Sequence, residues 1–171
     1  MAEMNNSEKW FDFMDLAKAL LLKGQPIDSY QPNIQFAIER SFDNNIFLQL
    51  EIKDDKVKWY RTTWLRLIDA PKILDPIESL KYIGERIVPT VVYEFGETNK
   101  ENVGGIISFC RQVSIQPVID KWGGIVLDGV FYTLMIGVER TQTTYKWHHL
   151  PDGWTDLQKL ADMLEELNLK L

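Results

Sequence analysis

Cysteine and histidine are nearly absent from this sequence. Cys110 is the only cysteine among 171 residues, and the two histidines, His148 and His149, are adjacent. A single cysteine excludes an internal disulfide framework and is typical of proteins in a reducing cytosol. A catalytic zinc site needs three protein ligands, and neither an HExxH spacing nor a CxxC pair occurs. We therefore expect no metal site.

Long apolar runs and an excess of basic residues are missing as well. No uncharged apolar run approaches the ~20 residues that a membrane helix needs. The apolar segment near the N-terminus is interrupted by Asp12, Asp15 and Lys18, unlike the core of a signal peptide. Acids outnumber bases 25 to 19, which gives a net charge of −6 and argues against binding to phosphate backbones. We expect a cytoplasmic protein that binds neither membranes nor nucleic acid.

The common cofactor and nucleophile motifs do not occur either. The pairs Gly104-Gly105 and Gly123-Gly124 form neither a phosphate-binding loop nor a dinucleotide fingerprint, and no GxSxG elbow is present. We therefore expect no cofactor.

Hydrophobic periodicity predicts an α+β fold. Apolar residues between Trp10 and Leu21 recur at steps of three and four, as in a helix, and after Asn33 the period changes to two, as in strands. The predicted elements are helices over 7–24, from Asp75-Pro76 to Pro89, from Thr98 through Val113 and from Trp154 through Leu167, and strands over 33–41, 46–53, 56–67, 90–95, 130–138 and 143–148, with an Asp-Gly hairpin at 128–129.

These elements favour a single domain over residues 1–171. We expect a mainly antiparallel sheet with N-terminal, central and C-terminal helices packed on one or both faces. Two subdomains divided near residue 72 are the less favoured alternative.

Both histidines lie in the stretch YKWHHLPDGW, residues 145–154. Tyr145 and Trp147 alternate as in a strand, and Asp152 can cap the helix that follows, so the stretch has a sufficient structural role. The alternative is an acid–base site, in which His148 or His149 acts with Asp152.

Two further patterns are chemically plausible but unspecific. Glu51 and Lys53, with Asp43 upstream, match the E-x-K element of metal-dependent nucleases, although they also fit outward strand positions and a turn. Cys110 could pair with a histidine as a nucleophile, but it lies on the apolar stripe of its predicted helix and is expected to be inert.

Aromatic residues are abundant, and Trp59, Tyr60 and Trp64 place large rings on both faces of one predicted strand. If helices cover only one face, the rings on the other face resemble interface hot spots. A second helix layer that covers this face is the more favoured alternative. The candidate binding residues are Glu51, Trp64, Glu97 and Glu101.

The C-terminal third, with LDGVFYTLMIG, YKWHHLPDGW and LADMLEEL, resembles small bacterial α+β proteins over residues 124–168. Some proteins of this kind are immunity proteins, so the resemblance implies a protein that binds and neutralises a cognate toxin, and it transfers no catalytic residue. Together with the acidic charge, it favours a non-enzymatic binding protein that occludes the active site of a basic toxin domain. A small hydrolase or nuclease-like enzyme is the alternative, and the sequence does not determine the oligomeric state.

Overall fold

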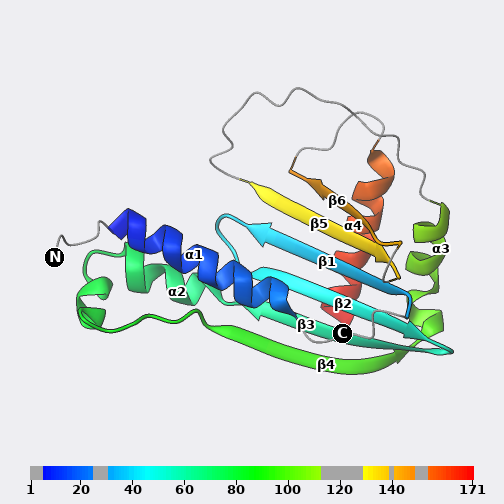
Figure 1. The fold of residues 1–171 in the computed structure, drawn as a ribbon, viewed down its shortest axis with the longest axis horizontal. Coiled ribbons are helices and arrows are strands. Elements are labelled where there is room, and N and C mark those ends of the chain that lie inside the picture. The colour runs from blue at the N-terminus through cyan, green and yellow to red at the C-terminus, as the bar shows by residue number, and fades with distance from the viewer. Residues whose placement is uncertain (1–5, 25–30, 113–128, 139–140, 149–153) are drawn as a thin grey trace.

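The computed structural model shows one six-stranded antiparallel sheet with helices on both faces (Figure 1). The predicted α+β class is therefore confirmed. Along the sheet the strands follow the order β4-β3-β2-β1-β5-β6. The structure describes residues 6–24, 31–112, 129–138, 141–148 and 154–171.

The first four strands form a continuous meander, and the last two extend the sheet beyond β1. Each strand pairs antiparallel with its neighbours, with Phe36 of β1 opposite Leu48 of β2 on one side and Leu134 of β5 on the other. The strands are β1 (Asn33–Arg40), β2 (Asn45–Lys53), β3 (Lys56–Trp64), β4 (Val91–Asn99), β5 (Val130–Gly137) and β6 (Thr143–Trp147).

The helices form two layers, because α1 and α2 pack on one face of the sheet while α3 and α4 pack on the other. At the end of α1, Gly24 adopts the left-handed conformation, with a φ of 57°, which glycine tolerates at a helix C-terminus. The helical elements are α1 (Asn6–Lys23), α2 (Arg66–Leu74), the 3₁₀-helix η1 (Glu78–Tyr82), the 3₁₀-helix η2 (Lys100–Val103), α3 (Gly104–Gln112) and α4 (Thr155–Lys170).

The larger core lies between the sheet and α3 and α4. Alternate residues of β1 and β2, such as Ile34, Phe36 and Leu48, face Leu157, Leu164 and their neighbours on α4. The smaller core lies on the opposite face, where aromatic rings of α1 pack against Phe47 and Trp64. Burial of apolar area of this kind contributes about 25 cal/mol per Å² to folding.

The region between β3 and β4 differs from the sequence prediction. The predicted third strand ends at Trp64 rather than at residue 67, and α2 begins at Arg66 although Pro71 lies inside it. The helix predicted to start at Asp75-Pro76 forms only the short 3₁₀-helix η1. Of the predicted Asp-Gly hairpin at 128–129, Asp128 and the residues that precede it lie outside the described residues.

No helix in the described parts of the chain is both long enough and apolar enough to span a bilayer.

Candidate protein-binding surface

The buried carboxylate of Asp69 links α2 to the sheet through hydrogen bonds. Asp69 is fully buried, and its two oxygens accept four hydrogen bonds. Trp64 Nε1 donates to Oδ2 over 3.0 Å and Lys72 Nζ donates to Oδ1 over 2.8 Å. The backbone N–H and the hydroxyl of Thr90 donate to Oδ2 and Oδ1, each over 2.7 Å. One side chain therefore joins α2, the end of β3 and the residue that precedes β4.

These hydrogen bonds favour the charged form of Asp69. Burial by itself would raise the pKa of this carboxyl group, but the hydrogen bonds from Lys72, Thr90 and Trp64 together outweigh burial and lower the pKa below its usual value. The carboxylate is thus ionised near neutral pH, where its acceptor capacity is matched by donors.

The start of α2 is held by an arginine that stacks on tryptophans. The guanidinium of Arg66 lies 5.3 Å from the ring centroid of Trp10 and 5.7 Å from that of Trp64. It also donates a hydrogen bond to the backbone oxygen of Arg40 over 3.0 Å. Stacking on both rings adds cation–π attraction to the packing of α1 against α2.

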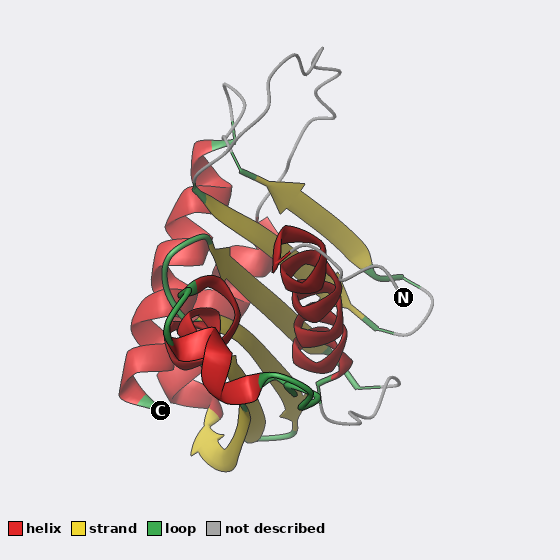
Figure 2. Ribbon diagram, turned by 90° about the vertical axis from the view of Figure 1, so that its left-hand side faces the viewer, coloured by secondary structure: helices red, strands yellow, loops and turns green. Residues whose placement is uncertain are grey.

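The outer side of this anchored region exposes large apolar side chains. Among the described residues, fifteen large hydrophobic side chains are exposed, and seven of them lie between residues 67 and 88. Figure 2 views the molecule from the end that carries α2 and η1. The seven residues, called the apolar segment below, are Leu67, Ile68, Leu74, Ile77, Leu80, Ile83 and Val88.

The central members of the apolar segment lie in and beside η1. Leu80 lies within this 3₁₀-helix, Ile77 is its N-terminal cap residue, and Ile83, its C-terminal cap residue, has extended backbone. Ile77, Leu80 and Ile83 are 77%, 63% and 75% exposed. The turn before them is fixed by Asp75, whose Oδ1 accepts the N–H groups of residues 77 and 78 over 2.8 Å each.

A hollow lies beside these side chains. Its volume is about 540 Å³, and it runs between the start of α1, α2 and the residues around η1. Leu80 and Ile83 line it together with Ile73, while Lys9 and Glu85 contribute charged groups. Its walls therefore combine apolar and charged side chains.

The edge strand β4 carries further exposed aromatic residues. Tyr93 and Phe95 are 47% and 78% exposed, and Phe95 stands directly opposite Tyr60 of β3. Beside them Glu97 forms an exposed ion pair with Lys56 over 3.2 Å.

The four binding residues predicted from the sequence do not form one surface. Trp64 has no exposed area, because α1 and α2 cover it as the favoured second helix layer, so it cannot contact a partner. Glu51 is also buried, at 6% exposure. Glu97 and Glu101 are exposed, on β4 and η2 respectively, and only Glu97 adjoins the exposed aromatic residues.

The residues of the enzymatic alternative are only partly within the described regions. His148 is half-buried, with its ring centroid 4.6 Å from that of Phe131, whereas His149 and Asp152 lie outside the described residues.

Burial raises the pKa of the Cys110 thiol to about 11, which disfavours the nucleophilic thiolate near neutral pH. In the regions that the structure describes, no group of three or more His, Cys, Asp or Glu side chains could hold a metal ion. The histidine site stays a prediction.

The sequence does not predict the exposure of the apolar segment. Leu80 and Ile83 lie on one face of the helix predicted between Asp75-Pro76 and Pro89, a pattern typical of a face that packs on a core, whereas the structure exposes both. The exact steps of three from Leu74 through Ile77, Leu80 and Ile83 were the available signal, since an α-helix has 3.6 residues per turn and a 3₁₀-helix has three.

No protein-family model, curated protein or solved structure matches this chain.

Proposed function

We propose that this protein functions by binding another protein through the apolar segment, as a cytosolic immunity-type inhibitor that covers the active site of a toxin. The observation that carries the proposal is the concentration of exposed hydrophobic side chains between residues 67 and 88, on a region anchored by the buried Asp69. Large apolar side chains exposed in one region of an otherwise well-packed protein are typical of interaction sites.

The anchoring of the segment supports recognition of a partner. Arg66, Asp69 and Thr90 fix both ends of the region through buried or partly buried hydrogen bonds. A surface that is ordered before binding loses less conformational entropy when the partner docks. The exposed residues therefore resemble the apolar centre of an interface, with charged groups at its margin.

The negative net charge of the chain would attract a basic partner from a distance, whereas the proposed contact region itself is neutral. Between residues 66 and 88 the sequence has four basic residues, Arg66, Lys72, Lys81 and Arg86, and four acidic residues, Asp69, Asp75, Glu78 and Glu85, so this region is neutral. The net charge of −6 belongs to the rest of the chain. Such a distribution steers a basic toxin toward the protein, while the apolar segment supplies the contact.

The test is co-expression with the proteins encoded beside this one, followed by co-purification and a growth assay. We expect one neighbour to be toxic alone, to form a stable 1:1 complex with this protein and to be silenced by it. The test variant carries Ile77→Ser, Leu80→Ser and Ile83→Ser. A matched control replaces three apolar residues that are exposed elsewhere, Phe42→Ser, Phe131→Ser and Leu169→Ser.

The test variant should lose the complex and the protection, and the control should retain both. Absence of any toxic neighbour would remove the immunity role, while a complex that survives in the test variant would remove the proposed surface. Self-association of the protein that only the test variant abolishes would identify a second copy as the occupant instead.

A further inference from the structure

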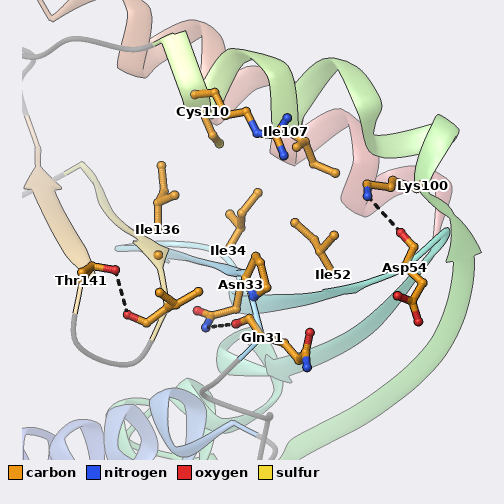
Figure 3. Close-up of a pocket in the computed structure, with 14 residues that line it drawn as sticks. Gln31, Asn33, Ile34, Ile52, Asp54, Lys100, Ile107, Cys110, Ile136 and Thr141 are labelled. Atoms are coloured by element: carbon orange, nitrogen blue, oxygen red, sulfur yellow. Dashed lines mark hydrogen bonds between the residues drawn. The ribbon is translucent and has the colours of Figure 1, made fainter.

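A cavity of about 470 Å³ lies on the other face of the sheet, between α3 and the ends of β1, β2 and β5 (Figure 3). Its floor is apolar, since Ile34, Ile52 and Ile136 point from the three strands toward α3. Ile107 and Cys110 of α3 close it from the opposite side. A volume between 300 and 1,000 Å³ with mostly apolar walls is the usual form of a small-molecule site.

Two cations that border this cavity have no carboxylate partner among the described residues. Lys100 and Arg111 both line it, and neither forms an ion pair with any described residue. Lys100 Nζ donates to the backbone oxygen of Asp54 over 3.0 Å, while the carboxylate of Asp54 points away from it (Figure 3). The cavity therefore combines an apolar interior with a margin that carries two cations and one carboxylate, that of Asp54.

We propose that this cavity binds a small anionic amphiphile, a monocarboxylate whose hydrocarbon chain lies on the isoleucines and whose carboxylate reaches Lys100 or Arg111. The hydrocarbon chain removes apolar surface from water, and the carboxylate gains a charge-assisted hydrogen bond. This site is separate from the apolar segment, so the inference does not depend on the proposed protein partner.

Cys110 provides a direct reporter of occupancy, because it is the only cysteine in the chain and it lines the cavity. Its thiol is half-buried, so a bound hydrocarbon chain would cover it further. Covering the thiol slows its reaction with an external reagent.

The experiment measures binding of octanoate, octanol and octylammonium to the full chain by calorimetry and by chemical-shift changes. We expect octanoate to bind about tenfold more tightly than octanol, since the alcohol can accept a hydrogen bond but lacks the negative charge that attracts the lysine or arginine. Octylammonium should bind more weakly than either. In parallel, octanoate should slow the modification of Cys110 by methyl methanethiosulfonate, and octylammonium should not.

Lys100→Gln and Arg111→Gln identify the end of the cavity that holds the carboxylate. One of them should weaken octanoate binding about tenfold and leave octanol binding unchanged. The matched control is Lys159→Gln, the same change on the exposed surface of α4, which should have no effect. Equal binding of the three probes, no binding of octanoate, or unchanged modification of Cys110 would each overturn the proposal. None of these outcomes bears on the protein-binding surface.

Discussion

The two faces of the sheet are covered in different ways. Among the described residues, sixteen are buried in the core under α3 and α4, and most of them are aliphatic. Eight are buried under α1 and α2, four of them aromatic, and this face also holds the buried Asp69. Only the second face is bordered by the apolar segment. The comparison indicates that the first face supplies most of the hydrophobic stability, while the second positions a surface that remains uncovered.

The largest effect is expected in the core under α4. Leu164→Ala should reduce the free energy of unfolding by about 3 kcal/mol, because it removes buried methyl groups and leaves a cavity. Chemical denaturation measures this change. The control, Leu169→Ala, affects a side chain that is 85% exposed and should cost no more than about 0.5 kcal/mol. Equal costs for the two variants would contradict the assigned role of this core.

A smaller loss is expected from Asp69→Asn on the opposite face. The neutral amide loses the charge that faces Lys72, and its NH₂ group cannot accept from Trp64 or Thr90. We expect a loss of about 2 kcal/mol. Glu78→Gln, which alters an ion pair on the surface of the same region, should cost less than about 0.5 kcal/mol. An unaltered stability of Asp69→Asn would show that these hydrogen bonds do not hold α2 in place.

The contribution of Asp69 to stability should also appear in the pH dependence of unfolding, without any mutation. The pKa of Asp69 is lowered in the folded protein, so its contribution to stability is present above its unfolded pKa and is lost as the pH falls through the folded value, which is below 3.8. The stability of the wild-type protein should therefore fall more steeply below about pH 4 than that of Asp69→Asn. Parallel pH profiles in denaturation experiments would indicate that Asp69 is not involved.

The smallest effect on folding is expected from the apolar segment itself. The combined variant Ile77→Ser, Leu80→Ser and Ile83→Ser should change the free energy of unfolding by no more than about 0.5 kcal/mol per site, since the three side chains are already exposed. Thermal and chemical denaturation measure it. A loss as large as that of Leu164→Ala would place these residues in a core rather than on a binding surface.

The elements with regular periods were predictable from the sequence, and those that depend on distant partners were not. Steps of two located β1, β2 and most of β3, and steps of three and four located α1 and α4. The helix α2 was missed because Pro71 normally excludes an interior helical position. The predicted role of Trp64 failed because α1, far away in the sequence, covers it.

The candidate site was less predictable than the fold. Asp69 receives hydrogen bonds from residues 5, 3 and 21 positions away in the sequence, and no local pattern indicates that these groups meet. In place of the predicted α-helix, the chain forms the short 3₁₀-helix η1 around Leu80 and extended backbone at Ile83, and both side chains are exposed. Hydrophobicity alone therefore assigned these residues to the core.

The most direct test of the binding surface is amide hydrogen exchange of the protein alone and in complex with its partner. If the apolar segment is the contact, the partner should slow exchange within residues 67–88 and leave α4 unchanged. Slower exchange confined to α4 or β6, with residues 67–88 unaffected, would contradict the account.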